Sequence, residues 1–281
     1  MDQPIQQSQQ FGATPPSKDK EPFLLLVFGG LLASVIIPVY LVKTGLGIDL
    51  YSTNMSRRSA PVSPATPYSE QDCKLIHDIF ACRNLGEIYA TGQGGVPLDY
   101  AKAAEYFAKG CELQDGFACK VMGELYFEGK GVPQDYTKAA KYFAKGCELQ
   151  DGLACGGLGL LYANGQGVTQ DYAKAAKYFA KGCELQDGLA CGGLGSLYAN
   201  NYGVPRDYAK AAEYFAKGCE LQVGYACETL GNLYLSGKGV PQNNAMAVKY
   251  LTKGWELNDA ESCTALSKLA EIGLGGGAQW R

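Results

Sequence analysis

The stretch CELQDGLAC stands at residues 147–155 and is repeated without change at residues 183–191. Close copies are CELQDGFAC at 111–119 and CELQVGYAC at 219–227. Every copy has two cysteines eight positions apart, and equivalent cysteines of neighbouring copies are 36 positions apart. A fixed period of this length is the signature of a repeat architecture, in which similar units stack against one another.

Each repeated unit predicts two helices separated by a turn that contains glycine. In residues 115–150, Asp115 is a suitable N-cap for a first helix, whose apolar residues recur with the helical period over 119–126. Glycines within 129–131 end that helix, and Asp135 can cap a second one. A single unit cannot bury its apolar faces alone, but stacked neighbours bury them together.

We therefore expect an all-α fold, a right-handed α/α solenoid over residues 71–274. It should contain about five 36-residue helix–turn–helix units and a terminal helix around 260–272. The net charge of −3 provides no basic surface of the kind that nucleic acid requires, so we expect no nucleic-acid partner.

The repeated pattern L-G-x-L-Y-x-x-G-x-G-V-P-x-D-Y-x-K-A-A-x-Y-F closely resembles the Sel-1-like repeat, a relative of the tetratricopeptide repeat. It reads MGELYFEGKGVPQDYTKAAKYF at 122–143, LGSLYANNYGVPRDYAKAAEYF at 194–215 and LGNLYLSGKGVPQNNAMAVKYL at 230–251. The paired cysteines further resemble the Hcp-type cysteine-rich branch of that family. This resemblance implies a secreted bacterial protein, and for some members a β-lactamase-like or penicillin-binding activity.

The two cysteines of each copy flank a tight turn between antiparallel helices, which brings their Cα atoms within disulfide range. The expected disulfides are Cys73–Cys82, Cys111–Cys119, Cys147–Cys155, Cys183–Cys191 and Cys219–Cys227. Reduced core thiols and zinc ligands are the other interpretations, although no C-x-x-C motif occurs. Because disulfides require an oxidising compartment, we expect the solenoid to lie outside the cytoplasm, in a bacterial periplasm.

The last unit departs from this rule. Trp255 replaces the first cysteine, which leaves Cys263 without a partner. We expect Cys263 to be a free thiol buried in the end cap, with an intermolecular disulfide as the alternative.

The N-terminal part of the chain predicts a membrane anchor. Residues 1–22 form a polar tail, and 23–43 contain an uncharged apolar stretch long enough to cross a bilayer. Residues 44–70 are rich in Ser and Pro and predict a linker, while 275–281 form a short C-terminal tail. A cleaved signal peptide and a buried core helix are the alternatives for 23–43. With disulfides beyond the span, we expect a single-pass inner-membrane protein.

The sequence contains no catalytic constellation inside the repeats. The S-x-x-K match at 17–20 and the K-T-G match at 43–45 flank the predicted span on opposite sides. His77 is the single histidine, which is too few for a zinc β-lactamase, and we expect it in the turn between the first two cysteines. We therefore assign no catalytic residue and expect no cofactor and no metal ion.

Positions that vary between repeats are not fixed by the packing of one repeat on the next. These positions predict a binding groove. In the family that the chain resembles, first helices line the concave side of the superhelix. The candidate groove residues are Arg83, Glu87, Lys120, Glu124, Phe127, Leu160, Ser196, Glu228 and Asn232. We expect a repeat scaffold that binds a protein or peptide there. The alternative is a solvent-exposed face that binds no partner. The other functions left open are β-lactam binding or hydrolysis, and stabilisation of a membrane complex.

Overall fold

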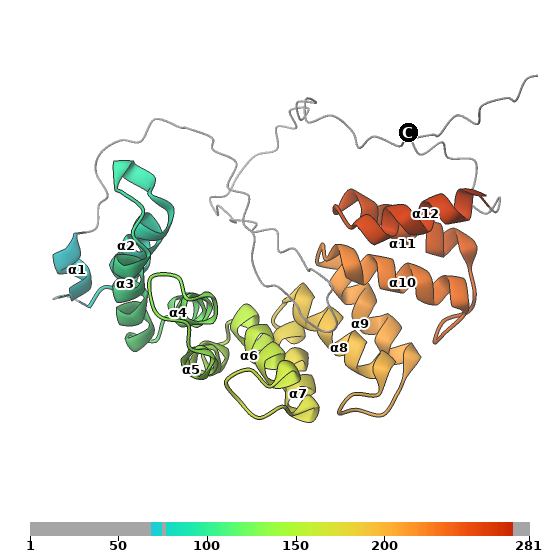
Figure 1. The fold of residues 1–281 in the computed structure, drawn as a ribbon, viewed down its shortest axis with the longest axis horizontal. Helices are drawn as coiled ribbons and strands as arrows, with labels where there is room; N and C mark the ends of the chain where they lie inside the picture. Colours follow the sequence, from blue (N-terminus) through green and yellow to red (C-terminus); the bar gives the residue numbers. More distant parts are fainter. Residues whose placement is uncertain (1–68, 75–76, 272–281) are drawn as a thin grey trace, which may run out of the picture.

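The computed structural model describes residues 69–74 and 77–271, and its regular structure there is entirely helical (Figure 1). Five helix pairs follow one another along the chain. The first helices are α2 (Ile79–Thr91), α4 (Gly116–Glu128), α6 (Gly152–Asn164), α8 (Gly188–Asn200) and α10 (Gly224–Ser236). The second helices are α3 (Tyr100–Glu112), α5 (Tyr136–Glu148), α7 (Tyr172–Glu184), α9 (Tyr208–Glu220) and α11 (Asn244–Glu256). Short α1 (Glu70–Lys74) precedes the pairs, η1 (Gln93–Gly95) follows α2, and α12 (Ala260–Glu271) ends the array.

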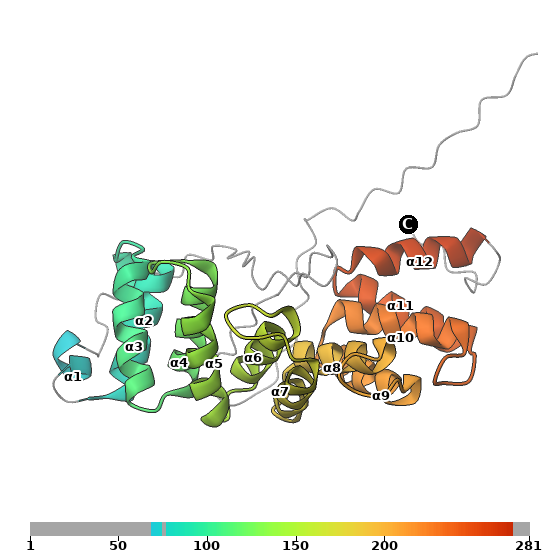
Figure 2. The ribbon, with the colours of Figure 1, turned by 60° about the horizontal axis from the view of Figure 1, so that its bottom comes forward.

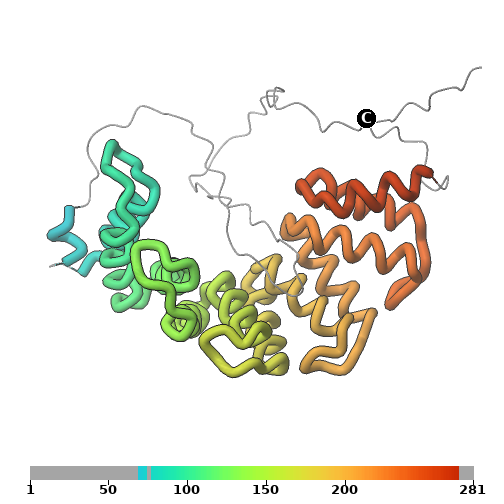
Figure 3. The backbone as a smooth tube through the Cα atoms, viewed as in Figure 1, coloured from blue at the N-terminus to red at the C-terminus, as the bar shows by residue number. Residues whose placement is uncertain are grey.

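The helix pairs form a curved solenoid, which confirms the expected all-α repeat architecture. Figures 1 and 3 show the array as an open arc, and Figure 2 shows the same pairs side by side along its length. Between neighbouring repeats, α4 lies close to α6, α6 to α8 and α10 to α12, whereas no two successive second helices from α3 onward come as close. The first helices therefore lie on the inner side of the arc and the second helices on the outer side.

Caps at both ends explain why the helices have the same length in every repeat. The Asp135 carboxylate accepts a hydrogen bond from the Lys138 backbone N–H at 2.9 Å and so caps the start of α5. At the end of α4, Gly129 adopts a left-handed conformation with φ of 71°, and its N–H bonds to the Leu125 carbonyl. The aspartates and glycines of the repeated motif thus set the helix boundaries.

In each helix pair, the second helix packs closely against the first helix at one glycine. An ideal Cβ on Gly123 would stand 2.5 Å from the Phe143 ring, so only glycine lets that phenylalanine pack against the α4 backbone. The equivalent contacts are Gly86 with Phe107, Gly159 with Phe179, Gly195 with Phe215 and Gly231 with Leu251. In α12 the corresponding residue is the exposed Ser267. Among the described helices, α12 therefore lacks the glycine at which the other first helices receive their second helix.

Disulfides join α1 to α2 and each second helix from α3 to α9 to the first helix that follows it. The bonded pairs are Cys73–Cys82, Cys111–Cys119, Cys147–Cys155, Cys183–Cys191 and Cys219–Cys227. Their Cα atoms are 4.5 to 4.7 Å apart. The turn that brings them together contains Gln150 in the left-handed region, followed by a bond from the Asp151 N–H to the Gly146 carbonyl at 3.0 Å. His77 also lies in a turn of this kind, with φ of 57°.

Cys263 corrects one expectation, because it is free but exposed rather than buried. The buried residue beside it is Ser262, whose hydroxyl donates to the Asp259 carboxylate at 2.7 Å. Cysteines of inner repeats are covered by the next helix pair, whereas no helix of the described chain follows α12. End position therefore explains the exposure of this thiol.

The predicted tail, membrane span and most of the linker (1–22, 23–43 and 44–70) lie outside the described residues, as does the C-terminal tail at 275–281. Among residues 69–74 and 77–271, no helix has the length and apolar character needed to cross a bilayer.

Candidate binding surface on the inner face

The inner face consists of first-helix side chains that point away from the paired second helix. On α4, positions 120, 124 and 127 fall within one narrow sector of the helix, opposite the buried residues at 118, 122 and 125. Position 117 belongs to the same sector, three residues before 120, and was not among the groove residues predicted from the sequence. Across the repeats this extra row is Phe80, Phe117, Leu153, Leu189 and Tyr225. The helical spacing alone could have identified it.

At the first contact between neighbouring first helices, a salt bridge connects α2 with the start of α4. The Arg83 guanidinium donates to both carboxylate oxygens of Asp115, with an Nε–Oδ2 distance of 2.8 Å. The guanidinium also lies 5.0 Å from the centre of the Phe117 ring. The Asp115 side chain is only 1% exposed, so this ion pair compensates a carboxylate that has left water.

At the second contact, Lys120 replaces the arginine and turns along its own helix. Its Nζ lies 3.4 Å from the Glu124 carboxylate and 4.5 Å from the Phe117 ring centre. Burial raises the pKa of Glu124, and the charge of Lys120 partly opposes this rise. Burial also raises the pKa of Asp151, whose carboxylate accepts the Ala154 N–H at 2.8 Å.

At the third contact the cation is missing. Gly156 takes the position of Arg83 and Lys120, and a Cβ there would overlap the Asp187 carboxylate. Asp187 is 5% exposed, accepts the Leu189 N–H at 2.9 Å, and makes no ion pair with a described residue. Burial raises its pKa to about 6.

At the fourth contact, between α8 and the start of α10, the side chains that meet carry no formal charge. Gly192 takes the position that Gly156 has in the preceding repeat, and the phenol of Tyr225 fills the space that a side chain at Gly192 would need. Val223 replaces the aspartate that caps the first helix in the other repeats. The Tyr225 hydroxyl donates weakly to the Leu189 carbonyl at 3.5 Å. The inner face therefore changes from salt bridges at the first two contacts to uncharged groups at the fourth, and Glu228 on α10 restores a carboxylate beyond it.

Two predicted groove residues are not surface residues. Lys120 is 2% exposed and Leu160 is 3% exposed, because the next first helix packs against that sector of each helix. They form the floor beneath the groove and cannot supply its contact surface. Sequence spacing identified the correct face but did not reveal which of its members the neighbouring repeat would cover.

The other predicted residues remain partly accessible. Glu87 is half-buried, burial raises its pKa, and it makes no ion pair with a described residue. Phe127 packs edge-on against Tyr136 with ring centres 5.3 Å apart. The Ser196 hydroxyl donates to the Gly192 carbonyl. The Asn232 amide donates to the Glu228 carboxylate at 2.6 Å. Leu153 is 49% exposed, and among the large apolar residues of this row only Phe80 on α2, at 63%, is more open.

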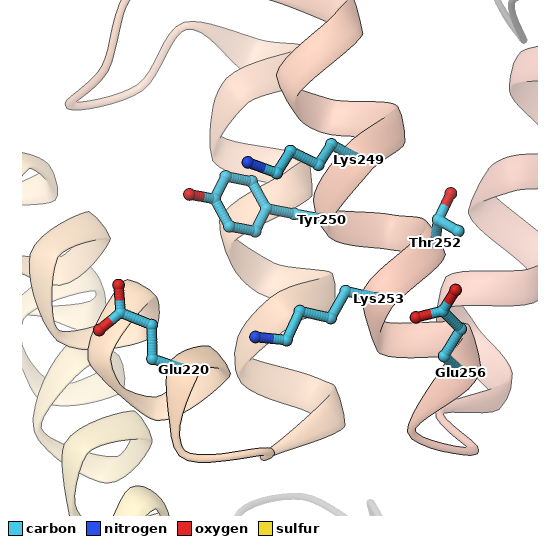
Figure 4. A pocket seen from close by; sticks show the side chains of 6 residues that line it. All are labelled: Glu220, Lys249, Tyr250, Thr252, Lys253 and Glu256. Carbon is cyan, nitrogen blue, oxygen red and sulfur yellow. The ribbon is translucent and has the colours of Figure 1, made fainter. Parts of the chain in front are cut away.

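A recess of about 490 Å³ lies on the outer side, between the end of α9 and the exposed side of α11 (Figure 4). Its lining residues are Glu220, Lys249, Tyr250, Thr252, Lys253 and Glu256. Two lysines and two glutamates balance each other, the Thr252 hydroxyl donates to the Val248 carbonyl, and Tyr250 stacks on Tyr234. The recess does not coincide with the predicted groove, and the formal charges of its four charged side chains cancel.

The Sel1 repeat model matches the chain at residues 79–115, 117–151, 152–187, 188–223 and 224–259. Beta-lactamase HcpA of Helicobacter pylori is 53% identical over 34 residues, which are 12% of this chain and 14% of that protein. This similarity to a cysteine-rich Hcp protein spans about one repeat.

Two solved structures share the fold. One is c5321, a protective antigen with an SLR fold from uropathogenic Escherichia coli: the TM-score is 0.66 at 30% identity, over 70% of this chain and 42% of that one. The other is a Sel1 repeat protein from Oxalobacter formigenes, with a TM-score of 0.68 at 26% identity, over 73% of this chain and 84% of that one. The matched repeats run continuously through all five helix pairs, and the chain therefore belongs to the Sel1 repeat family.

Proposed function

We propose that this protein is a repeat scaffold that binds a protein or peptide segment on the inner face of its solenoid. The observation that carries the proposal is the inner face itself. Five first helices line it, and no helix of the described chain lies across it (Figure 3). Side chains such as Leu153 stay open to solvent there, whereas the leucines of the first helices that face the core are buried. Repeat solenoids commonly bind partners through surfaces of this kind.

The proposed location is outside the cytoplasm, with residues 23–43 as a single membrane anchor and 44–70 as a linker to the solenoid at 71–274. The five disulfides support this location, because reducing compartments do not maintain such bonds. A reporter fused after Arg281 tests the topology. Alkaline phosphatase activity is expected from that fusion, and fluorescence of a cytosolic reporter in its place would refute the location.

Site-directed photo-crosslinking in the producing cell tests the binding face. A photoreactive residue at Ser196 on the inner face should give a discrete adduct, and the Leu153→Asp change should remove it. The matched position on the outer face is Lys177, which is exposed on α7. Equal adducts from both faces, or an inner-face adduct that survives Leu153→Asp, would contradict the proposal.

Hydrolysis of β-lactams is the alternative that the name of HcpA suggests. The similarity covers 34 residues, which is the length of one repeat, so it supports a shared building unit more directly than a shared activity. Nitrocefin turnover by the purified oxidised chain distinguishes the two functions. Turnover that survives purification and disappears in an inner-face variant would favour the enzyme over the scaffold.

A further inference from the structure

We propose that the segment bound on the inner face is extended and basic: it places a lysine or arginine beside Glu87 and Glu124 and an aliphatic side chain on Leu153. This refinement rests on the binding function proposed above. It names the chemistry of the partner from two independent features of the face, its charge balance and its one open leucine.

The charged side chains at the inner-face contacts between α2, α4 and α6 are not balanced in number. Arg83 is committed to Asp115 and Lys120 to Glu124. Glu87 and Asp151 interact with the same two cations at longer range but form no ion pair of their own among the described residues. Four carboxyl groups therefore share two cations, which leaves an excess of two negative charges when all are ionised.

Burial makes this excess costly to the free protein. It raises the pKa of Glu87 and Glu124, which means that their ionised forms are held less well than in water. A docked guanidinium or ammonium group would supply the missing counter-charge and form charge-assisted hydrogen bonds. An acidic partner would meet repulsion at the same place, so the charge pattern selects a basic segment.

The neighbouring repeats supply the apolar part of the surface. Leu153 projects from the first turn of α6 and is 49% exposed. One turn along α6 from Leu153, Gly156 carries no side chain of its own, and the Asp187 carboxylate fills the space where its Cβ would stand. Leu153 therefore projects from a closed surface, and an aliphatic side chain of the partner can lie against it.

The positions of these residues set the spacing in the partner. Glu124 and Leu153 lie on adjacent first helices, and along the helix axis they differ by about seven residues, or roughly 10 Å. Adjacent packed helices are about 8–10 Å apart. The separation is therefore roughly 14 Å, which about four residues of extended chain span.

The test is selection of a random peptide library on the immobilised, oxidised full chain, followed by affinity measurement with labelled peptides. Enriched peptides should carry Lys or Arg about four residues from Leu, Ile or Val. Because Glu87 makes no ion pair with a described residue, Glu87→Gln removes charge without unpairing a buried partner among them. It should weaken the binding of these peptides about tenfold and reduce the salt dependence of that binding. Lys177→Gln on the outer face is the matched control and should leave the affinity unchanged.

Charge reversal provides the decisive arm. Selection on Glu87→Lys should enrich peptides with Asp or Glu in place of the basic residue, while the aliphatic position stays the same. Peptides that need Leu153 but show no basic preference and no response to Glu87→Gln would overturn this inference and leave the binding function intact. Selections in which Leu153→Asp changes nothing would overturn the binding function as well.

Discussion

Replacing Asp187 by Asn should increase the free energy of unfolding at neutral pH but not at pH 4. Such a pH-dependent gain is expected for a buried carboxyl without a counter-charge among the described residues. This side chain is the N-cap of α8, and asparagine caps helices about as well as aspartate. The substitution therefore keeps the hydrogen bond to the Leu189 N–H and removes only the titration. The titratable groups that interact with Asp187 are the carboxyl of Asp151 and the phenol of Tyr225, and neither is a cation at neutral pH.

The magnitude follows from the pKa of Asp187, which is raised from 3.8 to about 6. Because the folded pKa lies above the unfolded one, the folded protein holds the proton more tightly between these values. Stability from this group is therefore fully present below about pH 4 and is lost as the pH rises through about 6. One unit corresponds to about 1.4 kcal/mol, so the loss is about 3 kcal/mol at pH 7.

Thermal and urea unfolding followed by circular dichroism at pH 4 and pH 7 measure this effect. Asp187→Asn should be more stable than the parent by up to about 3 kcal/mol at pH 7 and equal to it at pH 4. Asp115→Asn is the matched control and should have the opposite effect, since it leaves the Arg83 guanidinium without its carboxylate. The reasoning is refuted if Asp187→Asn destabilises the protein at pH 7, or if its effect is the same at both pH values.

Three further changes test the fold. Gly123→Ala should destabilise by about 1–3 kcal/mol because its Cβ would overlap the Phe143 ring, and unchanged unfolding would deny the close helix contact. The double change of Cys147 and Cys155 to Ala should cost about 2.5 kcal/mol for a nine-residue loop, measured in urea against the oxidised parent; no cost would mean that the bridge does not constrain the unfolded chain. Asp135→Ala should cost about 1 kcal/mol through loss of the α5 cap, and a stabilised variant would be inconsistent with the capping bond.

The sequence was sufficient to predict the helices and their pairing because each repeat carries its own local signals. Asp135 and Gly129 determine helix ends through contacts within a few residues, and the eight-residue cysteine spacing spans one tight turn. The same helix boundaries and the same turn then recur in each repeat because the sequence signals recur. Fold class and disulfide pattern are accessible from sequence for this reason.

Contacts between repeats were harder to predict. The burial of Lys120 and Leu160 depends on how far the next first helix is rotated and shifted, and no single repeat contains that information. The overlap of Asp187 with the space above Gly156 has the same origin. Cys263 is exposed although its sequence position matches a buried site in the inner repeats, and among the described residues no helix follows α12 to cover it.

Counting reactive thiols in the denatured, non-reduced full chain tests the central structural claim most directly. The chain contains eleven cysteines, and five disulfides leave Cys263 alone to react. One thiol per chain, rising to eleven after reduction, is the result that a stapled solenoid outside the cytoplasm predicts. Ten or eleven thiols before reduction would contradict both the covalent hairpins and the compartment inferred from them.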